Sequence, residues 1–586
     1  MSAVDAPGRA LTAERSFDRT SVAAVSASLG AMLVLLAWGA LHDSPTVDEP
    51  NHIVRGMALG RTGDARLSFA HPPLANGLQA LPVIVLGTSL PIEELEGWEE
   101  WAIETTVDSA AAHDYAAFRS AIVQGRFVTM ALTIALGLYL FFFVREFFGV
   151  VAARFAIVIY ALHPVFLAHG RLVTTDLPVT LGTLLFTGEL VRYLGSRRRL
   201  HLFTLGLSLA FACTVKFSGL FLVPPFAFAM AWAALRGSGR FPRELPRGRR
   251  LRLCARDFAI VGLITWAAVN ASYGFERTGM TVEQILAHEP EPDNWILRRA
   301  EGQLLEKISF LPSLPGWLPV PLPYSFVYGL FTIQAQNSKG HSGWFMGKES
   351  WDGNPLYFPI MFVLKNPAAL VLLLGIGVVL AWRRRGTLGH VACERLGHPL
   401  VVVPLFLSVL LLGTKIQIGI RHAMPIFPFL VLLAALVAAE IWSEGRRGRG
   451  VALGLVGLLA LEAIATQPHQ ISHFNWLVGG PAVGHRISMV GEDWGQDLAE
   501  VARLVREEKL EPLHYFPYVP VMLHELSHFG AHAVPIRCGD PAPSHGWYAT
   551  HAASALRSKD QCVPIDRNRP PDRIVNRHVW LYRIGP

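Results

Sequence analysis

The sequence predicts an α-helical polytopic membrane protein with about eleven transmembrane helices and a small extracytoplasmic α/β domain near the C-terminus. The first observation is composition: of 586 residues, 52% are hydrophobic and 17% are charged, whereas soluble domains carry about 25% charged residues. The second is the recurrence of apolar runs about 20 residues long, the length that spans a bilayer. The third is that arginines cluster between these runs. Membrane topology therefore explains the net charge of +7, and we expect no nucleic-acid partner.

The predicted spans begin near Val22 and continue to about Ala465. No small-residue cleavage pattern follows the first apolar run, so we expect a cytoplasmic tail (1–21) and an uncleaved first span. The spans are 22–41, 123–144, 151–169, 173–194, 201–216, 218–235, 257–274, 356–382, 399–413, 422–442 and 450–465. Residues 201–235 could form one long helix. We divide them at Lys216 and Gly219, because a lysine is unfavourable in the middle of a lipid-exposed helix.

Arginine clusters support this division independently of hydropathy. With the N-terminus inside, the cytoplasmic loops contain the arginines of 197–199, 236–256, 383–385 and 446–449, as the positive-inside rule requires. Joining the fifth and sixth spans would place the later clusters outside. The transmembrane module is then 22–465. The outer face receives loops 42–122 and 275–355, a tight turn near Arg171–Thr175, and an extracytoplasmic region at 466–586.

Carboxylates gather at this outer face. Asp48 and Glu49 follow the first span, with His52 close behind, and Asp176 lies at the turn between the third and fourth spans. Acidic groups near lipid are costly unless they pair, bind a metal or line a polar cavity. Each one alone could instead be a solvated residue at a helix end.

Cations lie at the same level, where the positive-inside rule does not explain them. Lys216 separates the fifth and sixth spans, and Lys415, Arg421 and His422 lie between the ninth and tenth. A phosphate held at the outer leaflet would account for them through charge-assisted hydrogen bonds. Carboxylates beside such cations predict group transfer from a lipid phosphate. A carboxylate could take a proton from an acceptor hydroxyl or hold a divalent metal, and the residue types leave both roles open.

Several segments carry a family resemblance. They are TVDEPNHIVRG followed by FAHPPLANGL, then RLVTTDLPVTL, TVKFSGLFLVPP, IGIRHAMPIFPFL and ISHFNWLVGGP with GEDWGQDL. Together they resemble polyprenyl-phosphate-dependent glycosyltransferases of the C-type membrane fold (glycosyltransferase family 39), which include protein O-mannosyltransferases and the lipid A aminoarabinose transferase. The resemblance covers about residues 22 to 500. It implies that a sugar moves from a polyprenyl phosphate to a protein, lipid or glycan acceptor, on the extracytoplasmic face of a bacterial cytoplasmic membrane.

The family's pattern also implies roles for residues. Asp48 is the leading catalytic base or metal-site carboxylate, with Glu49 beside it and Asp176 as its partner; a divalent metal, if bound, would lie at Asp48 and Asp176. The expected substrate-binding residues are His52, His71, Lys216, Lys415, Arg421, His422 and His341. His71 could orient a carboxylate or contact phosphate; alternatively, the prolines that follow it simply end a turn.

The second outer loop contains NSKGHSGWFMGKESWDGNP, which includes His341. Its glycines, aromatics and basic residues are typical of a mobile loop that covers substrate, although its tryptophans could equally dip into the membrane interface. Lys365 lies just inside the eighth span, and we expect it to extend outward as a weaker phosphate candidate.

Two other functions stay open at this stage. A lipid-phosphate transporter or flippase would use the same cations but would need no paired acids. A membrane zinc metalloprotease is suggested by HELSH, in which His524, Glu525 and His528 match H-E-x-x-H. The chain has 22 histidines, and Gly530 follows too soon for a long zinc-binding helix, so a strand or short helix is the favoured interpretation.

The region 466–586 has its own signals. Leu498, Val501 and Val505 have helical spacing, and LHYFPYVPVML is aromatic and β-branched, as in a strand. Cys538 and Cys562 share this polar region and could form a disulfide outside the cytoplasm. The region could bind the acceptor or cap the membrane part.

Overall fold

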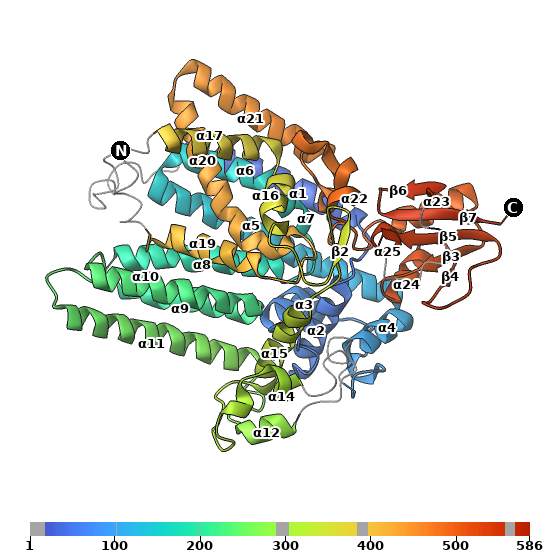
Figure 1. Cartoon of the computed structure of the whole chain (residues 1–586), viewed down its shortest axis with the longest axis horizontal. Coiled ribbons are helices and arrows are strands. Elements are labelled where there is room, and N and C mark those ends of the chain that lie inside the picture. The colour runs from blue at the N-terminus through green and yellow to red at the C-terminus, as the bar shows by residue number, and fades with distance from the viewer. Residues whose placement is uncertain are drawn as a thin grey trace.

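Helices make up most of the molecule, and a small sheet lies at one end (Figure 1). The computed structural model describes residues 18–100, 102–196, 198–288, 304–383, 396–556, 566 and 569–585. The helices at the predicted spans are α1 (Arg19–His42), α5 (Tyr115–Phe148), α6 (Val150–Ala161), α7 (Pro164–His169), α8 (Asp176–Gly195), α9 (Arg199–Val215), α10 (Val223–Arg236), α11 (Arg247–Ser272), α16 (Tyr357–Lys365), α17 (Ala368–Arg383), α19 (Pro399–Leu412), α20 (Phe427–Ser443) and α21 (Arg446–Ala465). The turn between α10 and α11 lies at the end opposite the sheet, in agreement with the predicted alternation of inner and outer loops.

All eleven predicted spans fall on helices, but fewer helices are long and apolar enough to cross a membrane. Among the residues that the structure describes, six helices meet that test, or seven if the bent pair α16 and α17, which meet at 113°, forms one span. The other predicted spans hold the shorter helices α6, α9 and α19, together with α8, which carries Glu189 and Arg192. Most residues of α6 and α8 are buried by neighbouring helices. Hydropathy alone counts such internally packed helices together with those that face lipid.

The predicted division at Lys216 is confirmed. Helix α9 ends at Val215, and Lys216 is extended, with φ −158° and ψ 141°. The 3₁₀ turn η2 (Phe217–Leu222) then leads into α10. The break therefore leaves Lys216 at a helix end, where its ammonium group can reach a polar partner.

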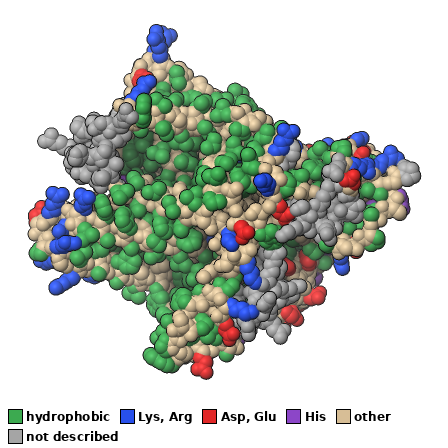
Figure 2. Space-filling model, in the orientation of Figure 1, with side chains coloured by type: hydrophobic (Ala, Val, Ile, Leu, Met, Phe, Trp, Pro, Cys, Tyr) green, Lys and Arg blue, Asp and Glu red, His purple; other side chains and the backbone are tan. Residues whose placement is uncertain are grey.

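The surface of the helical part is apolar. Figure 2 shows hydrophobic side chains over much of this face, with Lys and Arg gathered at its left end, where Figure 1 places the turn between α10 and α11. Large exposed side chains include Val34 on α1, Val378 on α17 and Leu405 on α19. Such an extended apolar surface suits lipid rather than water, and the chain is a multi-pass membrane protein.

The described parts of the two loops predicted to lie outside contain helices and one β-hairpin. The first contains α2 (Glu49–Thr62), α3 (Leu74–Leu86), η1 (Ile92–Glu94) and α4 (Ile103–His113). The second contains α12 (Val282–Ala287), α14 (Leu304–Ile308), η3 (Leu311–Ser313), α15 (Tyr324–Lys339), and the hairpin β1 (Gly343–Phe345) and β2 (Lys348–Ser350). Each loop has its own apolar core, which fixes the loop helices at the outer ends of the spans.

A five-stranded sheet follows the last span. Its elements, with the turns before it, are η4 (Ile420–Ile426, before α20), η5 (Gln470–Ser472), η6 (Trp476–Val478), η7 (Gly480–Val483), α22 (Gly484–Ile487), α23 (Leu498–Glu508), β3 (Leu513–Phe516), α24 (Val521–His528), β4 (Ala533–Pro535), β5 (Gly546–His551), α25 (Ala552–Leu556), β6 (Arg573–Val575) and β7 (Val579–Ile584). The strand order is β4-β3-β5-β7-β6, with β3 parallel to β4 and β5, and β7 antiparallel to β5 and β6. Helices α23 and α24 share a core with the sheet.

The expectations for this region hold in part. The predicted helix is α23, and HELSH lies on the short helix α24. The predicted strand ends earlier than expected, because Pro517 and Pro520 lack the N–H that a strand ladder needs and α24 starts at Val521. Cys538 is disulfide-bonded; its expected partner, Cys562, lies outside the described residues.

Candidate active site

Asp48 follows the C-terminal end of the first span. It is the N-cap of α2, and about a third of its side chain is exposed. Arg421 donates a hydrogen bond from Nη1 to Asp48 Oδ2. Burial raises the pKa of Asp48, but the Arg421 guanidinium outweighs this effect, so the pKa lies below its ordinary value. Asp48 is therefore an ionised, partly accessible carboxylate at neutral pH.

Asp176 joins the same cluster from another helix. It is the first residue of α8 and is buried. Lys216 Nζ lies 2.5 Å from Asp176 Oδ1, and Arg421 Nη1 lies 3.8 Å from Asp176 Oδ2. Arg421 thus bridges two carboxylates that are 128 positions apart in the sequence (176 − 48), and Lys216 flanks the second. The structure brings these four predicted residues together.

Glu49 is close to Asp48 but has a different environment. Its carboxylate is fully buried and accepts hydrogen bonds from Arg126 Nε (2.8 Å) and Nη2 (2.6 Å), and from the backbone N–H groups of Val173 (3.0 Å) and Thr46 (2.9 Å). The Arg126 Nη groups also donate to the carbonyls of residues 40, 43 and 44. All five N–H groups of this arginine therefore have acceptors. Both oxygens of Glu49 are enclosed by donors, which leaves none for a substrate.

Three imidazoles surround the carboxylates. His52 Nδ1 bonds to Asn76 Oδ1 at 2.9 Å, and its ring lies 5.0 Å from that of His71, centroid to centroid. Burial lowers the pKa of His52 to about 4 and holds the pKa of His71 well below its ordinary value. His71 Nδ1 and His422 Nε2 are buried and form no hydrogen bond, and the same is true of Arg421 Nε. These three atoms offer hydrogen bonds to a ligand.

A loop from the C-terminal region completes the site. The Trp494 ring covers the Arg421 guanidinium, 3.8 Å from the ring centroid to Cζ. The backbone N–H of Val47 donates to Trp494 O, at 3.0 Å. The loop approaches closely because Gly419 and Gly491 touch: a Cβ on Gly491 would lie 2.4 Å from Gly419 Cα, and both have positive φ. Trp494 therefore restricts where Arg421 can point.

Some predicted residues lie apart from this cluster. Lys415 is partly exposed and pairs with the exposed Asp352 at 3.1 Å. His341 Nδ1 lies 3.0 Å from Ser342 O, beside the β1–β2 hairpin. Lys365 was expected to extend outward, but it is buried and pairs with Glu492. Because an opposite charge lies inside the protein, the ammonium group of this lysine does not need to extend to the membrane interface.

The HELSH residues form a contact between domains. Glu525 is buried and accepts a hydrogen bond from Tyr115 Oη at 2.6 Å, and it lies 3.3 Å from Arg119 Nε. The rings of His524 and His528 lie against Tyr115. The glutamate that a protease would need as a base is thus occupied by α5, and α24 is attached to the membrane part there.

The sequence patterns did not identify three important residues: Arg126, Arg171 and Trp494. Arg126 lies inside a predicted span, where a charge marks a paired or functional position. Arg171 lies in the predicted outer turn and pairs with Asp43 at 2.7 Å. Trp494 belongs to the motif GEDWGQDL, and nothing in that motif indicated that the tryptophan would pack against Arg421.

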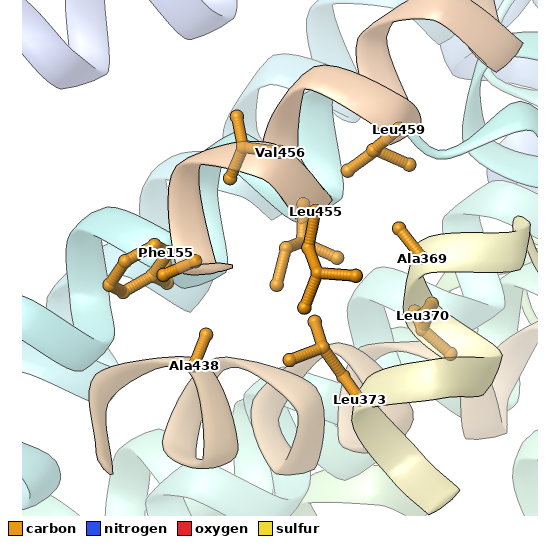
Figure 3. A pocket seen from close by; sticks show the side chains of 10 residues that line it. Phe155, Ala369, Leu370, Leu373, Ala438, Leu455, Val456 and Leu459 are labelled. Carbon is orange, nitrogen blue, oxygen red and sulfur yellow. The ribbon is translucent and has the colours of Figure 1, made fainter. Parts of the chain in front are cut away.

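A separate apolar pocket has a different character. It is lined by Phe155, Ile159, Ala369, Leu370, Leu373, Ala438, Ala452, Leu455, Val456 and Leu459 (Figure 3). Its walls come from α6, α17, α20 and α21. Because no lining side chain is polar, the pocket has nothing to hold or transfer a proton.

Comparison with protein families gives one match. Residues 115–244 match the model of the family described as dolichyl-phosphate-mannose-protein mannosyltransferase. This stretch runs from α5 to the turn after α10 and contains Arg126, Asp176 and Lys216. No curated protein matches the chain.

Solved structures similar to the chain come from bacteria, archaea and yeast. ArnT from Cupriavidus metallidurans bound to undecaprenyl phosphate is 12% identical, with 96% of this chain and 99% of that chain covered and a TM-score of 0.43. The Pmt1-Pmt2 protein O-mannosyltransferase of S. cerevisiae bound to the sugar donor is 11% identical, with 83% and 92% covered and a TM-score of 0.49. The oligosaccharyltransferase AglB of Archaeoglobus fulgidus with an inhibitory peptide and a dolichol-phosphate is 11% identical, with 93% and 72% covered and a TM-score of 0.48.

Proposed function

We propose that this chain is a membrane glycosyltransferase that moves a sugar from a polyprenyl phosphate to a protein, lipid or glycan acceptor. The reaction would take place on the extracytoplasmic face of a bacterial cytoplasmic membrane. The observation that carries the proposal is the arrangement around Arg421, which bonds to the accessible Asp48, lies near the buried Asp176 and keeps Nε without a protein partner. The family match over residues 115–244 supports the same reaction class.

The proposed reaction is a single displacement. Asp48 takes the proton of the acceptor nucleophile as that atom forms a bond to the anomeric carbon. The bond between that carbon and the phosphate oxygen breaks, and the electron pair leaves with the lipid phosphate. In this mechanism Arg421 Nε, His422 Nε2 and His71 Nδ1, which have no protein partner, would donate hydrogen bonds to the departing phosphate oxygens.

Glu49 has a supporting role in this proposal. It follows Asp48 directly in the sequence, and its buried pairing with Arg126 fixes the first turn of α2. Since both its oxygens face protein donors, we assign it to positioning Asp48 rather than to contact with substrate. This refines the sequence-based expectation that placed Glu49 among the catalytic residues.

The charges of the site favour a protein base over a metal-held carboxylate. Asp48 pairs with Arg421, and Asp176 pairs with Lys216. A divalent ion at Asp48 and Asp176 would have to displace both fixed cations or lie beside them. We therefore assign the counter-charge of the leaving phosphate to the cations Arg421 and Lys216, in addition to the hydrogen bonds from His422 and His71, and no step of the proposed mechanism uses a metal.

Sugar transfer in proteoliposomes tests the proposal. Wild-type chain would be supplied with a panel of radiolabelled polyprenyl-phosphate sugars and an acceptor extract, with and without chelator. Asp48→Asn should bind donor but lose transfer by at least about a thousandfold, a typical effect of losing a catalytic base. The matched control is Asp352→Asn, an exposed carboxylate paired with Lys415, which should keep wild-type activity.

The outcomes separate the candidate functions. Transfer that persists in Asp48→Asn contradicts the assigned base. Donor movement across the bilayer without transfer, equal in wild type and Asp48→Asn, would support a flippase instead. Loss of transfer with chelator, without a loss of thermal stability, would return the metal to the mechanism.

A further inference from the structure

A second polar cluster lies where the C-terminal region meets the membrane part. His469 lies in the turn after α21, while Asp497 and Glu500 lie at the start of α23. His42, at the end of α1, places its ring edge-on to that of His469, with 5.8 Å between centroids. Three separate segments therefore converge on this junction.

The geometry suits a metal ion. One ligand atom each of His469, Asp497 and Glu500 lies within 4.8 Å of the other two, and no other group of three His, Cys, Asp or Glu in the described ranges meets this criterion. Ligands of one zinc ion lie about 2.0 to 2.2 Å from it, hence roughly 3 to 4 Å from one another. A small change in side-chain conformation would bring the three ligand atoms to these distances.

His469 has an unused ligand atom. Its Nδ1 is buried, lies 3.5 Å from Asp497 Oδ1 and forms no hydrogen bond. A buried nitrogen without a hydrogen-bond partner is energetically unfavourable. An ion bound between this nitrogen and the carboxylates would remove that cost.

The carboxylates are held in place by neighbours. His578 Nδ1 lies 2.6 Å from Asp497 Oδ2, and Asn576 Nδ2 donates to Asp497 Oδ1 at 3.1 Å and to Glu500 Oε2. Metal-ligating carboxylates are usually oriented by such outer hydrogen bonds. The exposed Arg503 also pairs with this cluster, and its Nη2 lies 3.4 Å from Glu500 Oε1.

We propose that His469, Asp497 and Glu500 form a site for a divalent transition-metal ion, with zinc as its occupant, which fastens the C-terminal sheet domain to the membrane module. An imidazole with two carboxylates suits zinc, whereas magnesium and calcium favour oxygen ligands alone. The remaining coordination position would take water. The site is independent of the proposed transferase reaction.

Metal binding to the full-length protein tests this proposal. The chain, without a polyhistidine tag, would be purified in detergent, stripped with chelator and titrated with zinc against a chromophoric competitor. Cobalt substitution would report the ligand field. Wild type should bind one tight equivalent of zinc per chain, give a cobalt absorption band and gain thermal stability with zinc.

Two variants and one control make the test specific. His469→Ala and Glu500→Gln should each weaken the tight equivalent by at least tenfold and abolish the zinc-dependent stabilisation. Glu507→Gln changes an exposed carboxylate on the same helix, α23, and should behave as wild type. The proposal is overturned if wild type binds no stoichiometric zinc, or if the tight equivalent survives in both variants. Because the readouts are binding and stability, neither result depends on whether the chain transfers sugar.

Discussion

Replacing Glu49 by glutamine should destabilise the protein far more than the equivalent change at its neighbour Asp48. In Glu49→Gln, an amide NH₂ takes the place of an oxygen that now accepts at least two hydrogen bonds. Oε1 accepts from Arg126 and Val173, and Oε2 accepts from Arg126 and Thr46. In either orientation of the amide, donors face donors, and the buried guanidinium loses its counter-charge.

The magnitude follows from burial. Both Glu49 and Arg126 are at most 1% exposed, and removing one partner of such a pair costs about 3 to 5 kcal/mol. Asp48 is about a third exposed and pairs with Arg421 alone, so Asp48→Asn should cost roughly 1 kcal/mol or less. Activity should fall in both variants, for different reasons: Asp48→Asn loses the base, whereas Glu49→Gln misplaces it.

The assay is equilibrium unfolding in mixed detergent micelles, measured on wild type, Glu49→Gln, Arg126→Met, the double variant and Asp48→Asn. Arg126→Met alone should also be severe, while the double variant should recover part of the loss because no buried charge remains unpaired. The reasoning is refuted if Glu49→Gln and Asp48→Asn unfold with similar free energies, or if the two single effects simply add in the double variant.

Three further predictions concern charge, pH and packing. Lys216→Met should lower the free energy of unfolding by roughly 1 to 3 kcal/mol and reduce transfer, because it leaves the buried Asp176 carboxylate with only a more distant cation. Lys415→Met removes an exposed pair and should change neither quantity. Equal effects of the two substitutions would contradict the assigned roles. The pKa of His52 is about 4 when folded, against an ordinary value of 6.5, so the unfolded chain binds more protons between these values. Its contribution of up to about 3 kcal/mol is complete above pH 6.5 and is lost as the pH falls toward 4, so melting curves of His52→Asn should vary less over this range than those of wild type. Gly491→Ala should lower transfer at least tenfold by forcing apart two touching backbones, whereas Gly454→Ala, which has open space around its Cβ, should leave transfer unchanged.

Local sequence signals predicted much of the fold and half of the site. The break at Lys216, the helix at α23 and the convergence of Asp48, Asp176, Lys216 and Arg421 all followed from hydropathy, loop polarity and motif resemblance. These features depend on where a residue lies along a span and on which side of the membrane the span ends. Both quantities can be read along the chain.

Pairing partners could not be predicted in this way. Lys365 and Lys415 were both expected to place their ammonium groups near the outer face, yet one pairs with Glu492 inside the protein and the other with Asp352 at the surface. Position relative to the membrane cannot distinguish the two lysines. Their partners come from segments that are distant in the sequence or have no regular residue pattern.

The sequence by itself determined that this chain is a helical membrane protein whose acids and outward-facing cations collect at the outer ends of its spans. Only the tertiary structure decided which of those charges face one another, that Arg126 encloses Glu49, and that Trp494 covers Arg421. The physical reason is that the two kinds of property depend on residues over different distances. Insertion of an apolar segment depends on its own residues over about 20 positions, whereas the pKa and accessibility of a carboxylate depend on groups within a few ångströms, which packing brings from anywhere in the chain.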